Sequence, residues 1–192
     1  MMDRAVRGYW ITGALAFMRL QYGAETSASL LEALPRELRA SLPQVGPAEW
    51  VPRAHHVQLL RIIGSVQRTE LGVLEDLLSY GQYVGTELAN GALKQFMLVV
   101  TPKLFAKKLP NLWIRDHLDD GRLEGDLAAV DEARLPLRFS GIRGYDHVGV
   151  VGLGWVRGVM SRFNRKGLQV KQSGWSLRHV APDEMTGEVS WS

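Results

Sequence analysis

The segment VGVVGLGWVRG, residues 148–158, places four glycines among large apolar side chains, and it limits the fold more than any other stretch of the chain. On a helix, Gly149 and Gly152 share one face, while Gly154 and Gly158 share another. Each glycine costs a helix roughly 1 kcal/mol relative to alanine, so a close contact should compensate. We therefore predict a buried helix whose backbone approaches a sheet or a partner helix.

The same glycines do not predict a nucleotide-binding loop. Gly152, Gly154 and Gly158 give the spacing G-x-G-x-x-x-G, which departs from the dinucleotide fingerprint, and no Gly-Lys-Ser/Thr sequence follows them. The apolar run at 148–160 is also too short to cross a bilayer, which takes about twenty residues. No catalytic residue is predicted, and whether the chain is an enzyme stays open.

Apolar periodicity and capping residues predict helices in the first 120 residues. Thr26 or Ser27 is expected to cap the second helix, and Pro102 to kink or restart the last one, since proline cannot donate a backbone hydrogen bond. The expected helices cover 9–23, the stretch ETSASLLEALP at 25–35, 35–42, the stretch around 57–66, 69–91 and 92–119.

After Gly121 the apolar period changes to that of strands. Two short runs form an expected hairpin, the glycine-bearing helix follows, and two further runs form a second hairpin. The predicted fold class is α+β, with an N-terminal helical layer followed by a four-stranded antiparallel sheet. We expect a single domain over 1–192, made of a helical part, 1–120, and a strand-strand-helix-strand-strand part, 121–192. The runs expected to form the hairpins are 122–130, 134–142, 167–180 and 185–191.

The chain has no cysteine, which excludes disulfides, thiol nucleophiles and thiolate metal sites and favours a cytoplasmic protein. His55 and His56 are adjacent and point about 100° apart on a helix, so they are not expected to hold one ion. The stretch DHLDD at 116–120 is expected to be a solvated helix end, with His117 at the surface beside acids. No metal site is predicted.

Charge and hydropathy limit the classes of partner that this chain is expected to bind. Residues 94–178 carry fifteen Lys and Arg against eight Asp and Glu, but these charges are scattered and no basic helix is interleaved with aromatic residues. Nucleic acid is therefore not an expected partner. The N-terminal apolar stretch is interrupted by polar residues and is interpreted as the first core helix, and no membrane span is expected.

The segment LPLRFSGIRGYDHVGVVGLGWVRGVMSRF, residues 135–163, resembles the C-terminal part of haem-based nitric oxide and oxygen sensor domains. In those domains a strand with Tyr-x-Ser-x-Arg leads into a glycine-containing helix, and Phe139, Gly141 and Arg143 stand at the matching positions here. The order of elements also resembles vinyl-reductase-like regulatory domains and TRAPP trafficking-complex subunits. With the stretch WVPR at 50–53 and a final strand ending in Trp, the chain is most similar to a myxobacterial protein family of about this length.

The resemblance also implies which residues this chain would need in order to bind haem. The sensors hold iron through a helical histidine roughly thirty residues before the tyrosine, which corresponds here to the region of Leu109, where Lys107, Lys108 and Pro110 offer no such ligand. Only Arg143 of the Tyr-x-Ser-x-Arg trio is present. The regulatory domains often carry zinc-binding cysteines, which this chain lacks. Neither haem nor a metal is therefore expected.

Two functions remain. The first is a non-catalytic sensory or regulatory module that binds a small hydrophobic or aromatic ligand in a pocket between helices and sheet. The alternative is a TRAPP-like interaction or scaffold module, which would form a homodimer or bind a protein partner through the glycine-bearing helix or the helix at 57–66. The candidate ligand-binding residues for the first function are Trp113, Phe139, Arg143 and Trp155.

Overall fold

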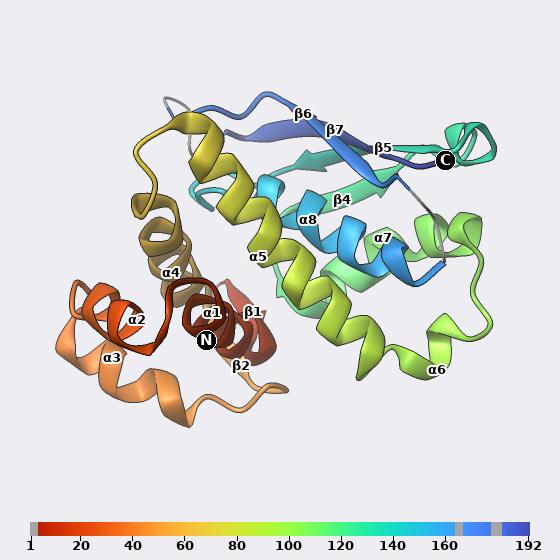
Figure 1. Ribbon diagram of the computed structural model, residues 1–192. Helices are drawn as coiled ribbons and strands as arrows, with labels where there is room; N and C mark the ends of the chain where they lie inside the picture. Colours follow the sequence, from red (N-terminus) through yellow and green to blue (C-terminus); the bar gives the residue numbers. More distant parts are fainter. Residues whose placement is uncertain (1–3, 164–166, 178–181) are drawn as a thin grey trace.

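The computed structural model describes residues 4–163, 167–177 and 182–192, and the first part of the chain is helical as predicted (Figure 1). The helix expected at 92–119 is divided in two at Pro102. The helices before the main sheet are α1 (Gly8–Tyr22), α2 (Ala24–Leu31), α3 (Arg36–Ser41), α4 (Arg53–Ser65), α5 (Glu70–Asn90), α6 (Lys94–Met97) and α7 (Pro102–Asp116), with a short 3-10 helix at Leu42–Gln44.

Capping residues set where two of these helices begin. The Thr69 hydroxyl accepts a hydrogen bond from a backbone N–H of the first turn of α5, and Thr101 does the same for α7, where Pro102 occupies the first helical position. The cap predicted for α2 was wrong. That helix begins at Ala24 directly after Gly23, with no side-chain cap.

The four-stranded antiparallel sheet is confirmed, and with it the α+β fold class. Its strands are β4 (Arg122–Gly125), β5 (Arg134–Ser140), β6 (Gln169–Ser173) and β7 (Glu184–Ser190), in the order β4-β5-β7-β6. The two predicted hairpins therefore pair through β5 and β7, where Phe139 lies opposite Met185. The end of the third predicted run, 178–180, lies outside the described residues.

A second sheet of three very short strands was not predicted. Strand β1 (Ala5–Arg7) pairs antiparallel with both β2 (Trp50–Pro52) and β3 (His117–Leu118), so that Val6 lies opposite Val51 and His117. Strands of two or three residues are too short to show alternation in the sequence. This small sheet ties the start of the chain to the end of α7.

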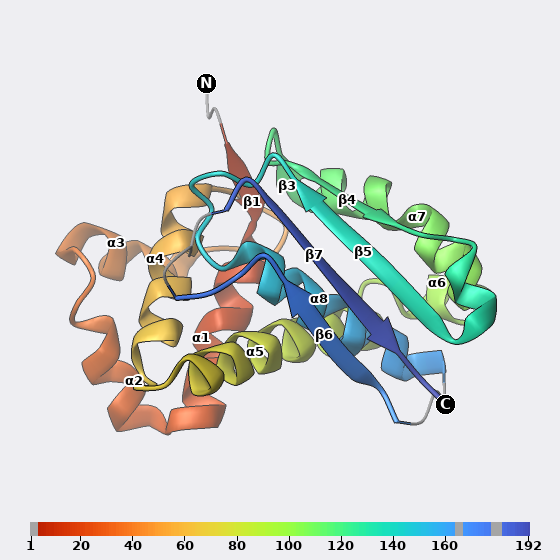
Figure 2. The same ribbon diagram turned by 90° about the horizontal axis from the view of Figure 1, so that it is seen from above.

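Helix α8 (Val148–Met160) carries the four glycines and lies between the main sheet and α5 (Figures 1 and 2). Gly149 and Gly152 face the sheet, as their spacing predicts. A β-carbon at Gly149 would lie 2.7 Å from the sulfur of Met185, and one at Gly152 would lie 2.5 Å from the ring of Phe139. This face of α8 contacts side chains.

The opposite face of α8 contacts backbone. A β-carbon at Gly154 would fall on the carbonyl oxygen of Leu78, and one at Gly158 on that of Gln82, both in α5. Helix α5 contributes glycines of its own at the same crossing. We refer to Gly81 and Gly85 of α5 with Gly154 and Gly158 of α8 as the glycine seam, which confirms the predicted close approach to a partner helix.

No helix among the described residues has both the length and the hydropathy needed to cross a bilayer. The face of the main sheet opposite α8 carries no helix in Figure 2, and its outward side chains on β5 and β7 are polar apart from Pro136. The alternation of buried and exposed residues along β5 and β7 follows from this one-sided burial.

Candidate functional site

The sequence-predicted site residues are divided between the core and the surface. Trp113 and Phe139 pack edge to face with ring centroids 5.6 Å apart, and both are buried. Trp155 is also buried, on α8 beside the glycine seam. Arg143 does not reach these rings, because its side chain is 81% exposed and its nearest acid is Asp183 at 3.9 Å.

A chain of buried polar side chains lies where the N-terminal helices meet the sheet part. The Tyr80 hydroxyl donates to the backbone carbonyl of Trp10 at 2.6 Å, so it accepts from Nε2 of His56 at 2.9 Å. Nδ1 of His56 then carries a lone pair and accepts from the Tyr145 hydroxyl at 2.5 Å. Each proton in this chain has one consistent position, with His56 neutral. Burial lowers the pKa of His56 well below its usual value, in agreement with that state.

His117 was predicted to lie at the surface, and this was wrong. Its side chain is buried, and its ring stacks on Trp113 with centroids 3.9 Å apart. The unforeseen pairing of β3 with Val6 of β1 covers it. Burial lowers the pKa of His117 to about 4, although Asp116 opposes the shift. The expected solvated helix end is therefore largely interior, since Asp116 and Asp120 are buried too.

Asp120 is directed inward by a tight turn. Asp119 and Gly121 on either side adopt left-handed backbone conformations, with φ of 51° and 71°. Inside, Oδ1 of Asp120 accepts a hydrogen bond from the Arg53 guanidinium at 2.7 Å. Burial raises the pKa of Asp120, and the charge of Arg53 lowers it in opposition. This ion pair joins the start of α4 to the turn before β4.

Three buried polar atoms in this region have no hydrogen-bond partner among the described residues: Trp10 Nε1, His117 Nε2 and Asp120 Oδ2. A buried polar group without a partner costs about 1–3 kcal/mol, so three close together call for an explanation. We refer to the residues of this region as the polar junction, namely Trp10, Arg53, His56, Tyr80, Trp113, His117, Asp120 and Tyr145.

A cleft of about 470 Å³ opens directly at the polar junction. His117 and Asp120 form its buried side, and the turn and the end of β5 form its rim. The volume lies within the range of small-molecule sites, about 300–1,000 Å³. We call this the His117 cleft. Its lining residues are Ile114, His117, Asp119, Asp120, Gly121, Arg122, Ser140 and Gly141.

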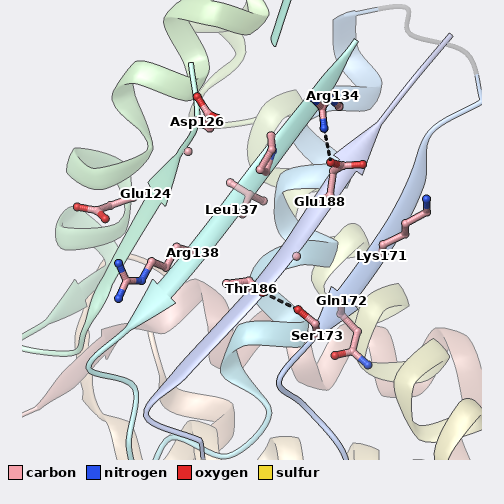
Figure 3. A pocket seen from close by; sticks show the side chains of 13 residues that line it. Glu124, Asp126, Arg134, Leu137, Arg138, Lys171, Gln172, Ser173, Thr186 and Glu188 are labelled. Carbon is pink, nitrogen blue, oxygen red and sulfur yellow. Dashed lines mark hydrogen bonds and ion pairs between the residues drawn. The ribbon is translucent and has the colours of Figure 1, made fainter. Parts of the chain in front are cut away.

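A larger hollow of about 810 Å³ lies on the outer face of the main sheet (Figure 3). Figure 3 shows charged side chains standing on β5 and β7, where Arg134 lies 3.7 Å from Glu188. Arg138 likewise pairs with Glu184, and Ser173 bonds to Thr186. Because these groups are exposed and satisfy one another, this hollow is a solvated face and a weaker candidate than the His117 cleft.

In the part of the chain that the structure describes, no group of three His, Cys, Asp or Glu side chains is placed to hold an ion. His56 uses both ring nitrogens in hydrogen bonds, while the neighbouring His55 is directed to a different, partly exposed position.

Sequence reasoning missed most of the polar junction. His56 lies one helical turn before Leu60 and two turns before Ile63, and this apolar face was a usable signal for its burial. Tyr80 similarly continues the buried stripe of α5. Nothing in the local pattern marks Tyr145, which lies in a loop, or Asp120, which depends on a turn.

The fold matches solved structures of H-NOX proteins. An H-NOX protein from Shewanella oneidensis in the Fe(II)NO ligation state aligns with a TM-score of 0.67 and 12% identity, over 97% of this chain and 99% of that one. An Fe(II) unliganded H-NOX protein from K. algicida aligns with a TM-score of 0.71 and 12% identity, over 97% and 96%. Neither a protein-family model nor a curated protein sequence matches the chain. The architecture is H-NOX-like.

The residues of this chain do not fit haem at the positions that the resemblance assigns to it. Leu109 is fully buried and packs beside Gly125 of β4. Phe139 fills the space under α8, and Arg143 is directed to the surface. Nε2 of His117 has no partner among the described residues, but the atom is buried, and its ring stacks on Trp113 and lies 5.4 Å from the ring of Trp10.

Proposed function

We propose that this protein is a non-catalytic sensory or regulatory module that binds a small ligand in the His117 cleft, without haem. The H-NOX-like fold supports a ligand-binding module, since one matched protein is described in an Fe(II)NO ligation state and another as Fe(II) unliganded. The hydrophobic or aromatic character expected of the ligand stays a prediction. The proposed site differs from the aromatic pocket expected from the sequence, because Trp113, Phe139 and Trp155 pack within the core.

One observation carries the proposal: His117 and Asp120, each with a buried acceptor atom that has no partner among the described residues, line a cleft of ligand size. A buried carboxylate oxygen and a buried ring nitrogen without partners lower stability, and a ligand recovers that free energy where it displaces the groups that enclose these atoms. Binding free energy from such groups is therefore available at this site.

The polar junction also connects the cleft to the N-terminal helices through a series of side-chain contacts. Asp120 holds Arg53, whose guanidinium lies 5.4 Å from the ring of Tyr145, and Tyr145 bonds to His56. A ligand that draws Asp120 away from Arg53 would alter a hydrogen-bonded chain that reaches α1. Such a change in the helical layer is the output that we assign to the module.

A fragment library tested by thermal unfolding examines this proposal. A ligand of the cleft raises the melting temperature of the wild type, because it binds only the folded state. The shift should be lost in His117→Phe, which keeps a ring on Trp113 but removes the free nitrogen. It should be retained in His55→Phe, a matched change on α4 outside the cleft.

Two results would overturn the proposal. One is a set of hits that all stabilise His117→Phe as well as the wild type, which would place the ligand elsewhere. The other is a library with no hit at all.

The interaction module expected as the alternative has one supporting observation. Leu98 and Val99, in the turn between α6 and α7, are each 78% exposed, which is unusual for large apolar side chains. The helices first considered for such a surface do not provide it, because α8 is covered by α5 and the sheet and α4 packs inward. A Leu98→Asp variant with unchanged molar mass by light scattering would exclude self-association through this turn.

A further inference from the structure

Two large apolar side chains are held out in solvent at the turn between α6 and α7. Leu98 and Val99 are each 78% exposed. Leu93 before them and Val100 after them are buried. The backbone N–H groups of Leu98 and Val99 donate hydrogen bonds to carbonyl oxygens of α6. Because both ends of the turn are anchored in the core and its donors are satisfied, the exposure of this apolar pair is a fixed feature of the fold.

The chain around this turn carries only positive charge, since residues 88–115 contain no Asp or Glu. The basic residues of this stretch are Lys94, Lys103, Lys107, Lys108 and Arg115. Lys103 bonds to Asp131 at 2.6 Å, and both of these side chains are exposed. Arg115 bonds to its neighbour Asp116. The remaining three lysines form no ion pair with the residues that the structure describes, so their charge is available to a partner.

The solvent-facing side of α7 continues the same surface. Phe105 and Leu109 lie on its buried side. Leu104, Lys107 and Lys108 are three and four residues apart and share the exposed side. In both views α6 and the start of α7 lie on the side of the molecule away from α2 and α3 (Figures 1 and 2). We refer to the following residues as the α6–α7 surface: Lys94, Leu98, Val99, Leu104, Lys107 and Lys108.

The composition of this surface favours a membrane over the other partners that an exposed apolar patch can have. A second copy of the chain would bring like charges together. A nucleic acid would bind the lysines, but it offers no apolar layer to Leu98 and Val99, and its bases stack on aromatic rings, of which this surface has none. A bilayer with anionic lipids provides both an acyl layer and a negative charge complementary to the lysines.

We propose that the α6–α7 surface docks the protein on membranes that contain anionic lipids. Leu98 and Val99 enter the boundary between headgroups and acyl chains, and the lysines lie at the level of the lipid phosphates. The hydrogen bonds within the turn let its backbone enter this layer without unpaired donors. The His117 cleft lies at the other end of α7, where Ile114 lines it, so the two sites are tested independently.

Co-sedimentation of the full chain with vesicles tests the apolar contact. We expect vesicles of phosphatidylcholine and phosphatidylserine, mixed roughly 2:1, to bind the wild type at least about tenfold more tightly than vesicles of phosphatidylcholine alone. The double variant Leu98→Ser with Val99→Ser should bind the mixed vesicles at least about tenfold more weakly. The control Leu20→Ser changes a leucine of α1 that is 75% exposed, and it should bind like the wild type.

The contribution of charge is tested with a second pair of double variants. A lysine near an anionic membrane contributes about fivefold in affinity, the ratio that roughly 1 kcal/mol provides, so Lys107→Gln with Lys108→Gln should weaken binding at least about tenfold. Arg36→Gln with Arg39→Gln removes the same two charges from α3 and lowers the net charge of +3 equally. This control should bind like the wild type, because salt screens charges beyond about 8 Å.

Insertion can be measured at one position, because the chain has no cysteine of its own. A bimane attached through Leu98→Cys should emit at shorter wavelength on the mixed vesicles, and lipids with a nitroxide on the acyl chain should quench it. The same label attached through Leu20→Cys should remain in water.

Several results would overturn the proposal. These are no binding to the mixed vesicles, unchanged binding when Leu98 and Val99 are replaced, and a bound protein whose label at Leu98 remains in water. A wild type that is dimeric by light scattering, with a monomeric Leu98→Asp variant, would assign the surface to a second copy of the chain. Tighter binding of duplex DNA than of mixed vesicles, with the same dependence on Lys107 and Lys108, would assign it to nucleic acid.

Discussion

Two junctions join the helical part to the sheet part, and they are built in opposite ways. The glycine seam brings α5 and α8 together backbone to backbone, so that a β-carbon at Gly154 or Gly158 would meet a carbonyl oxygen. The polar junction brings side chains together instead, through the chain from Tyr145 to Trp10, and it leaves three polar atoms unpartnered.

The difference shows which junction can respond to a ligand. At the seam every shift of one helix drives backbone against backbone, and closely packed interiors resist such changes. At the polar junction a hydrogen bond can be exchanged for another at little net cost. We infer that the seam fixes the two parts in place while the polar junction adjusts.

The largest loss of stability in a test of this contrast is expected for Gly158→Ala. The added carbon meets the backbone oxygen of Gln82, which cannot move without shifting α5, so we expect a loss of about 3 kcal/mol, at the upper end for overpacking. That exceeds the gain of roughly 1 kcal/mol in helix propensity. Chemical denaturation measures the change.

Gly149→Ala is the matched control on the other face of α8. There the new carbon meets the flexible end of Met185, which can move aside, so the loss should be smaller than at Gly158. Equal losses at the two positions would show that the seam is not the more rigid contact.

The polar junction is tested by Tyr145→Phe. Removal of the hydroxyl leaves Nδ1 of His56 buried without a donor, and we expect a loss of about 2 kcal/mol in the free energy of unfolding. Tyr22→Phe serves as the control, because its partner Asp76 is still bonded by Gln67 and Tyr22 itself is partly exposed. If both variants lose the same free energy of unfolding, the hydrogen bond of Tyr145 contributes no more to stability than the partly buried one of Tyr22.

Acid should weaken the polar junction more than the seam, which has no titrating groups. Below pH 6.5 the unfolded chain protonates His117, whereas the folded ring stays neutral until about pH 4. The unfolded state then binds more protons, so the free energy of unfolding decreases as the pH is lowered through this window, by about 1.4 kcal/mol per pH unit. Denaturation curves should show a shallower slope for His117→Phe, and an unchanged slope would contradict the assigned burial.

The smallest expected effect is that of haemin. Because Trp10 and Trp113 flank His117 and Leu109 is packed against β4, added haemin should give no sharp one-to-one Soret band. Absorbance titration of the wild type beside His117→Phe is the measurement. A stoichiometric complex that disappears in the variant would identify His117 as an axial ligand and would show that the junction opens widely.

The seam could be predicted from sequence and the polar junction could not, for a physical reason. Glycines at helical spacing in α8 predict a close contact but do not identify the element that makes it. The alternation of apolar and polar residues in the strands predicts the sheet. His117 and Asp120 are buried by β1, a strand of three residues that is distant in the sequence, and by a turn at Gly121. Such contacts depend on tertiary pairing, which local periodicity does not encode.

The glycine seam has a consequence for synthesis on the ribosome. Helix α5 emerges well before α8, because residues 91–147 separate them. Until α8 follows, the α5 face that carries Gly81 and Gly85 has no partner to cover it, and the nascent chain exposes apolar surface. We therefore expect ribosome-bound chains that end before Val148 to associate with chaperones, and release of the chaperone to coincide with the appearance of the fourth glycine.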